Sequence, residues 1–176
     1  MSNPMDNLQK VQSFKLVSNN LNVEGMFAKQ QYSGMFGVEG GQDESPELSW
    51  SGVPVETKSF TLTMYDPGAP TQSGFWHWAM MNIPANTQSL VAGAGAANSD
   101  KLPEGTLLMP NDARAKQYIG AAPVKGDAPH HYYVTLTALD VAKLDIPDDS
   151  TPAFMNFNMI GHELGRAVLE IKAEIK

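Results

Sequence analysis

Four side chains that can bind or transfer protons stand at the ends of strand-like segments in this sequence. Asp66 closes the segment KSFTLTMYD, His77 opens HWAMMNIP, and His130 and Tyr132 stand at the start of HHYYVTLTALD. Tyr132 lies two residues after His130, so both side chains point to the same face of a strand. If the strands of His77 and His130 are neighbours, an acid, two imidazoles and a phenol meet at one end of a sheet.

Such a cluster favours the binding of a small anion. Imidazoles and a tyrosine hydroxyl donate hydrogen bonds to phosphate or carboxylate, and flanking glycines let backbone N–H groups face a ligand. Taken singly, each residue also has a structural explanation, because a histidine at a strand end bonds a carbonyl and an aspartate before proline makes a turn. Two histidines and an aspartate can also hold a metal, but the spacing matches no metal motif. We therefore expect neither a metal nor a cofactor.

Catalytic motifs are absent from the sequence. It has no G-x-S-x-G elbow and no glycine-rich phosphate loop, and nothing pairs Ser51 or Ser73 with a base. His162 falls in a predicted helix, where a capping or core role is the simpler interpretation. We predict no catalytic residue and a non-enzymatic binding or regulatory protein, with a weak hydrolase as the enzyme alternative.

Composition narrows the partners and the compartment. The 176 residues carry a formal net charge of −7 and include no cysteine. An acidic chain is a poor ligand for nucleic acid or for an anionic membrane, and a chain without cysteine forms no disulfide. The N-terminus lacks the pattern of a secretory signal, and no stretch reaches the roughly 18 apolar residues of a membrane span. We expect a cytoplasmic protein.

The element pattern predicts a mostly β domain covering residues 1–176, with a loosely ordered arm over residues 1–12. Residues 58–66, 77–84, 131–140 and 167–176 have the alternating or buried pattern of strands. Helix is expected at residues 151–167, where Thr151 can cap and Pro152 stands at the first helical position, with a short turn at 140–146. Residues 85–125 read as a long loop.

The same stretches resemble a known family. Five segments resemble the signatures of the phosphatidylethanolamine-binding protein family, also called the Raf kinase inhibitor-like family. In chain order they are SPELSW, YDPGAP, SGFWHWAMMNIP, YIGAAPVKGDAPHHYYVTLTALD and FNMIGHELGRA. The resemblance runs from about residue 14 to the C-terminus and points to the bacterial YbhB/YbcL branch. It implies antiparallel sheets packed as a sandwich with one or two C-terminal helices.

The resemblance also implies a pocket for anions such as phosphate, a carboxylate or a phosphoethanolamine-like headgroup. Three features depart from the usual family pattern. Gly68 replaces a second acid, His131 stands where arginine is common, and the usual GPxPP appears as GAAPV, which keeps only Pro123. Carried over position by position, the expected ligand-binding residues are Asp66, His77, Gly120, Pro123, His130 and Tyr132.

The function predicted from these residues is the binding of a small anion. The alternative is an inhibitor of a protein partner, a protease or a kinase, which would use the same pocket to recognise a phosphorylated or acidic side chain. A homodimer is a further possibility, for which residues 85–117 are the candidate contact.

Overall fold

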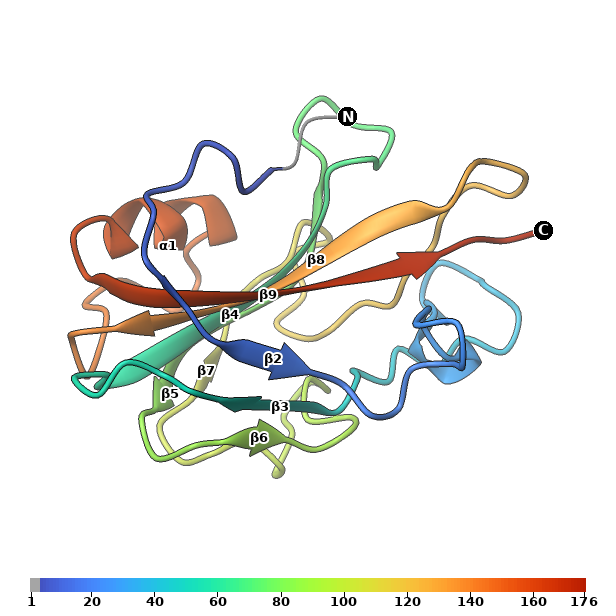
Figure 1. The fold of residues 1–176 in the computed structure, drawn as a ribbon. Helices are drawn as coiled ribbons and strands as arrows, with labels where there is room; N and C mark the ends of the chain where they lie inside the picture. Colours follow the sequence, from blue (N-terminus) through green and yellow to red (C-terminus); the bar gives the residue numbers. More distant parts are fainter. Residues whose placement is uncertain (1–3) are drawn as a thin grey trace.

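Two β-sheets of unequal size form the framework of the protein (Figure 1). The computed structural model describes residues 4–176. The larger sheet has six strands in the order β1–β9–β8–β4–β5–β7, and the smaller has three in the order β2–β3–β6. The strands are β1 (Gln12–Ser13), β2 (Lys15–Val17), β3 (Leu48–Ser51), β4 (Ser59–Asp66), β5 (Phe75–Pro84), β6 (Ser89–Leu90), β7 (Leu107–Leu108), β8 (His130–Leu139) and β9 (Glu163–Ala173).

The predicted fold class, mostly β with packed antiparallel sheets, is confirmed. All paired strands run antiparallel except β1 and β9, which are parallel, so the larger sheet is mixed. The three long central strands, β4, β5 and β8, correspond to the segments that the sequence marked as strands. A single α-helix, α1 (Pro152–Met159), and a 3₁₀ turn, η1 (Lys29–Gln31), complete the elements of residues 4–176.

The main hydrophobic core lies between the two sheets. Leu62, Trp78 and Leu136 from the larger sheet are fully buried there, together with Leu48 and Trp50 from the smaller one. On the other face of the larger sheet a second apolar cluster packs under α1 and includes Met81, Leu139, Met155 and Met159. Because β4, β5 and β8 are covered on both faces along much of their length, they form a rigid support for the side chains at their ends.

The predicted helix over residues 151–167 is correct only in its first half. Thr151 caps the helix by accepting a hydrogen bond from the backbone N–H of Phe154 at 3.1 Å, and Pro152 occupies the first turn as expected. The helix ends at Met159, and Gly161 then adopts a φ of +88°, a conformation that turns the chain away from the helix. Residues 163–173 pair with β8 instead, so the predicted helix beyond Met159 is wrong, and His162 lies in the turn.

The short helix predicted at residues 140–146 is also wrong. That segment is a bend whose backbone groups bond to side chains of the central strands. The N–H of Leu144 donates to Asn82 Oδ1 at 2.9 Å, and the carbonyl of Val141 accepts from the hydroxyl of Ser59 at 2.6 Å. These bonds replace the local ones that a helix needs, so tertiary contacts override local preference.

The segment predicted as a loop, residues 85–125, contains the short strands β6 and β7 at the edges of the two sheets. Within residues 4–176, no helix is both long enough and apolar enough to cross a membrane.

Candidate functional site

Strand β4 brings the predicted site residues together. Asp66 is the last residue of β4, which lies between β5 and β8 and pairs with both. The assumption that the strands of His77 and His130 are direct neighbours is therefore wrong. Their side chains nevertheless meet over the end of β4: the His130 Nδ1 donates to Asp66 Oδ2 at 2.8 Å, and the rings of His77 and Tyr132 stand 5.2 Å apart in an edge contact.

Asp66 is the centre of a buried hydrogen-bond network. Its Oδ2 accepts from His130 at 2.8 Å, its Oδ1 accepts from the backbone N–H of Gly68 at 2.7 Å, and its charge acts on the phenol of Tyr132. Burial, reinforced by the charge of Asp66, raises the pKa of Tyr132 far above its ordinary value. Tyr132 is therefore protonated at every physiological pH, and both oxygens of the carboxylate accept hydrogen bonds from protein groups.

His77 is held as a neutral ring. Its Nδ1 lies 3.0 Å from the carbonyl oxygen of Ile119, and the N–H of Ile119 returns a bond to the His77 carbonyl at 3.0 Å. Burial lowers the pKa of His77 below its ordinary value and outweighs the opposing effects of the Ile119 carbonyl and the Asp66 charge. A neutral ring that donates from Nδ1 keeps Nε2 as an acceptor. Any positive charge in the cluster therefore comes from His130.

The expected wall residues, Gly120 and Pro123, lie on the segment that closes the back of the cluster. Gly120 is required by a close approach, since a Cβ there would lie 2.3 Å from the backbone carbon of Tyr32. Its N–H donates to Asp43 Oδ1 at 2.8 Å. Pro123 is buried, and the N–H of the preceding Ala122 reaches the Tyr132 hydroxyl. The structure thus places both wall residues beside the cluster.

Three contributors to the site were not foreseen from the sequence: Asp43, Ile119 and Ala122. Asp43 anchors the wall by accepting from Gly120, 77 residues away, while Ile119 and Ala122 act through backbone groups. Because every residue has the same backbone groups, the residue types of Ile119 and Ala122 do not show that they contact the site. The positive φ of Asp43, 51°, is a local feature for which aspartate is favoured, but it does not reveal the partner.

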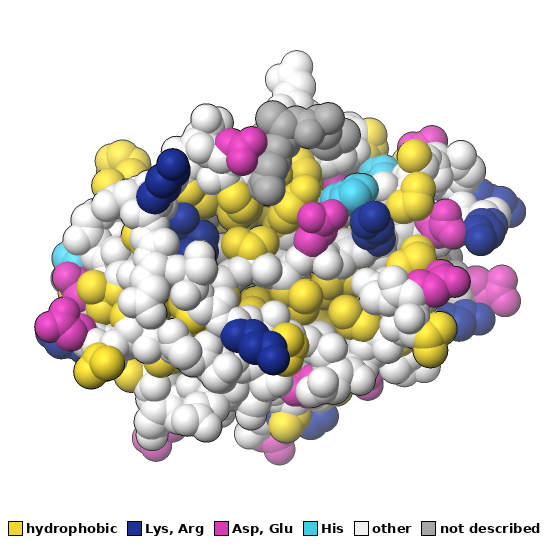
Figure 2. All heavy atoms as spheres, viewed as in Figure 1, with side chains coloured by type: hydrophobic (Ala, Val, Ile, Leu, Met, Phe, Trp, Pro, Cys, Tyr) yellow, Lys and Arg dark blue, Asp and Glu magenta, His cyan; other side chains and the backbone are white. Residues whose placement is uncertain are grey.

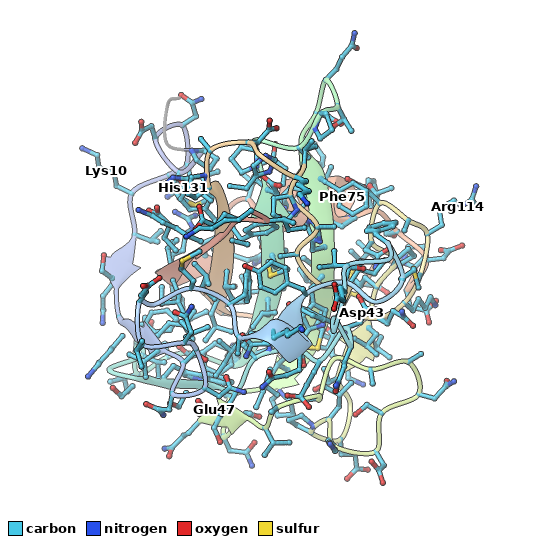
Figure 3. All side chains as sticks on the ribbon, turned by 90° about the vertical axis from the view of Figure 1, so that its right-hand side faces the viewer. Lys10, Asp43, Glu47, Phe75, Arg114 and His131 are labelled. Atoms are coloured by element: carbon cyan, nitrogen blue, oxygen red, sulfur yellow. The ribbon has the colours of Figure 1, made fainter. Side chains whose placement is uncertain are left out.

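Burial decides which residue of the cluster a ligand can touch. The exposed fractions of Asp66, His77 and Tyr132 are 2%, 4% and 1%, whereas the His130 side chain is 11% exposed. His130 also borders a cavity of about 570 Å³, which we call the His130 cavity, lined by residues 67–68, 127–131 and Tyr133. Figure 3 looks onto this end of the molecule, with His131 and Phe75 on opposite sides of it. The buried residues support His130, which meets the cavity.

A second, larger cavity of about 640 Å³ lies elsewhere. It runs between residues 4–9 of the N-terminal arm, helix α1 and the outer face of the larger sheet, and its lining is mostly apolar. Figure 2 shows hydrophobic side chains gathered beside the arm on this face. None of the six predicted ligand-binding residues lines it, so size alone does not mark the candidate site.

The described residues hold no group of three or more His, Cys, Asp or Glu side chains that could bind a metal ion. The acid and imidazole groups at the end of β4 instead bond to one another and to the backbone.

Comparison with known proteins gives the family. The family model described as phosphatidylethanolamine-binding protein matches residues 18–174. The chain belongs to the phosphatidylethanolamine-binding protein family. The match contains the whole cluster at the end of β4, together with the two wall residues, so these features are part of the family domain.

Bacterial members of this family are similar along almost the whole chain. The protein YbcL of Escherichia coli is 41% identical over 165 residues, 93% of this chain and 89% of the relative. Its crystal structure superposes with a TM-score of 0.87, covering 93% of this chain and 99% of the other, at 38% identity. The protein YbhB of Escherichia coli is 39% identical over 153 residues, 87% of this chain and 95% of the relative.

A third relative extends the comparison beyond Escherichia coli. The crystal structure of the phosphatidylethanolamine-binding protein homologue CT736 from Chlamydia trachomatis is 26% identical to this chain, with a TM-score of 0.75. The alignment covers 94% of this chain and 99% of the other. CT736 and this chain therefore share the same fold although their sequence identity is low.

Proposed function

We propose that this protein is a binding protein for small anions, with phosphate or a phosphate-bearing headgroup held against His130. The observation that carries the proposal is the fixed orientation of the His130 ring. Its Nδ1 is bound to the buried carboxylate of Asp66 at 2.8 Å, and the ring forms part of the wall of the His130 cavity. Nε2 is then the ring atom available for a ligand.

The chemistry of the ring couples anion binding to a proton. Where the ring is neutral and donates from Nδ1 to Asp66, Nε2 is an acceptor, and it bonds only an anion that carries its own proton, as hydrogen phosphate does. The ring must take up a second proton before Nε2 can donate, which also gives it the positive charge that a phosphate attracts. The hydrogen bond between Nε2 and the anion therefore contains one proton, which comes from the ring or from the phosphate.

Two further observations support binding rather than hydrolysis. The residues that line the His130 cavity include no serine or threonine, so no hydroxyl nucleophile of that kind stands beside His130 within this lining. Asp66 is buried and its two oxygens accept from His130 and from the N–H of Gly68, so it does not serve as a free general base. The description of the family names phosphatidylethanolamine as a ligand, and the phosphate of that headgroup has the chemistry proposed here.

Calorimetric titration of inorganic phosphate and of phosphoethanolamine tests the proposal. His130→Ala should weaken both by about tenfold or more, because hydrogen bonds to charged groups contribute roughly 1.5–3 kcal/mol. His162→Ala is the matched control, since His162 also bonds an aspartate through Nδ1 at 2.8 Å but lies outside the cavity lining. Tighter binding of phosphoethanolamine than of phosphate identifies a headgroup, and the reverse identifies free phosphate.

Equal affinity of the wild type and His130→Ala would contradict the proposal. So would an equal loss in His162→Ala, because that result would place the anion on the general surface rather than against His130.

A further inference from the structure

The larger cavity, of about 640 Å³, lies on the opposite side of the larger sheet from the main core. We call it the arm cavity, because residues 4–9 of the N-terminal arm form one of its walls. Helix α1 forms another wall and the outer face of β4 and β8 forms the floor; Figure 1 shows the arm and α1 on this side of the sheet. The arm cavity shares no lining residue with the His130 cavity. A ligand held in it would therefore be separate from the proposed anion site.

The floor of the arm cavity carries hydroxyl groups that the protein leaves without partners. Thr63 of β4 lies opposite Thr135 of β8, and Thr137 follows two residues later on the same face. Thr63 and Thr137 are only 5% and 2% exposed, yet neither hydroxyl has a hydrogen-bond partner within residues 4–176. A buried hydroxyl without a partner destabilises a fold. Stability of the protein alone therefore does not explain these two threonines.

The walls of the arm cavity are apolar and open to solvent. Leu8 of the arm, Phe157 of α1 and Ile160 just after α1 all line it and are 42%, 69% and 65% exposed. Figure 2 shows hydrophobic side chains gathered beside the arm. Large apolar side chains that gather around a hollow, above a few polar groups, are typical of a small-molecule site. The volume also lies in the usual range of such sites, roughly 300–1,000 Å³.

The charges in the lining indicate that the ligand is neutral. Glu163 and Arg166 are the only charged residues that line the arm cavity among residues 4–176, and they form an ion pair with each other. Arg166 also donates to the backbone carbonyl of Gln9 at 2.9 Å, which ties the arm to β9. The lining therefore offers no unpaired charge to a ligand, and the burial of a charged ligand without a partner would be costly.

We propose that the arm cavity is a binding site for a neutral molecule with an apolar body and a hydroxyl or carbonyl group. The polar group of the ligand bonds the threonine hydroxyls of the floor, Thr63 and Thr137. The apolar body lies between the arm and α1, against Leu8 and Phe157. This site adds a second class of ligand to the protein and does not depend on His130.

Titration with 1-octanol tests the inference. The methyl NMR signal of Thr135 and the indole NMR signal of Trp76 report binding, because both residues line the arm cavity. Both signals should shift saturably in the wild type. Octanoate at about pH 7.5 has the same chain with a charged end, and it should bind at least about tenfold more weakly, because its charge would be buried without a partner. Inorganic phosphate should not compete with 1-octanol.

Two variants test the location of the site. The double variant Thr63→Val/Thr137→Val removes both hydroxyls and should weaken 1-octanol binding about threefold to tenfold, the loss expected for one hydrogen bond. Ala153→Trp places a large ring at an exposed position of α1 that lines the cavity, and it should abolish binding. Thr106→Val is the matched control, because the Thr106 hydroxyl also lacks a partner but lies outside the cavity lining, and it should bind as the wild type does.

The melting temperature without ligand separates a ligand-binding role from a structural one. Thr63→Val/Thr137→Val should melt at the same temperature as the wild type or higher, because the substitution removes hydroxyls that have no partner. A lower melting temperature would show that the hydroxyls support the fold, and it would overturn the inference.

Three further results would also overturn the inference. The first is the absence of saturable 1-octanol binding in the wild type, which would leave the cavity to water alone. The second is wild-type affinity in both the double threonine variant and Ala153→Trp, or an equal loss in Thr106→Val, since either would place 1-octanol elsewhere. The third is tighter binding of octanoate than of 1-octanol, which would contradict a site for neutral ligands.

Discussion

Three histidines of this protein make the same bond in different surroundings. His130, His131 and His162 each bond a carboxylate through Nδ1, with Asp66, Glu170 and Asp140 as partners. The side chains of the Asp66–His130 pair are 3% and 11% exposed, whereas those of the pair formed by His162 and Asp140 are 44% and 45% exposed. Figure 2 shows histidine side chains at the upper right of the surface, next to acidic and basic ones.

The difference teaches that burial, rather than pairing, produces a fixed ring. An exposed ion pair competes with water and contributes little, about 0–1 kcal/mol. A buried pair is costly to break, because the partner left behind is an unpaired charge or polar group without water. The Asp66–His130 pair is further held by the N–H of Gly68 and by Tyr132. Its ring can therefore present one nitrogen to a ligand at a constant position.

The largest effect in this comparison is expected from removing the acid of each pair. Asp66→Ala should lower the free energy of unfolding by about 3 kcal/mol or more, because it leaves the partly buried donors His130 Nδ1 and Gly68 N–H without their acceptor. Asp140→Ala, the same substitution at the exposed pair, should lower it by less than about 1 kcal/mol. Urea denaturation followed by fluorescence measures both. Equal losses would show that burial does not distinguish the two pairs.

A smaller effect separates His77 from the other histidines. The pKa of His77 is lowered by burial, so below the ordinary value of about 6.5 the unfolded chain binds a proton that the folded protein does not. The free energy of unfolding should therefore fall as the pH drops from about 6.5 toward the lower folded-state pKa, with a slope of up to about 1.4 kcal/mol per pH unit from this group.

His77→Asn isolates that contribution, because its amide can still donate to the Ile119 carbonyl but does not titrate. Urea denaturation at about pH 7.5 and about pH 5.5 should show a shallower dependence on pH in the variant than in the wild type, since the other three histidines are common to both. The same dependence in both proteins would mean that His77 is not held neutral by burial.

The sequence predicted the central strands and the composition of the cluster for a clear reason. Phe60, Leu62 and Met64 alternate with threonines in β4, and this period marks a strand without knowledge of its partners. Strand ends then limit where Asp66, His77 and His130 can lie. Residue types do not reveal the order of the strands, because strands pair through backbone groups that every residue has. The position of β4 between β5 and β8 was therefore not predicted.

The errors near the C-terminus have a different origin. The wrongly predicted residues 160–166 include glutamate, leucine and arginine, which favour helix, and only Gly161 marks the break after Met159. The strand predicted from residue 167 onward is correct as far as Ala173. Pairing with β8 at ten positions, from Glu163 to Ala173, decides the outcome. The sequence also did not predict how deeply each side chain of the cluster is buried. Asp66, His77 and Tyr132 are buried and support the site, whereas His130 borders the cavity.

The central claim is that the ring of His130, fixed by a buried carboxylate, receives the anion. Long-range ¹H–¹⁵N NMR of the four histidine side chains during a titration with phosphate tests it most directly. The nitrogens of His130 should shift saturably, while those of His162 should not change. A titration in which His130 is unmoved, or in which His162 shifts as much as His130, would contradict the account.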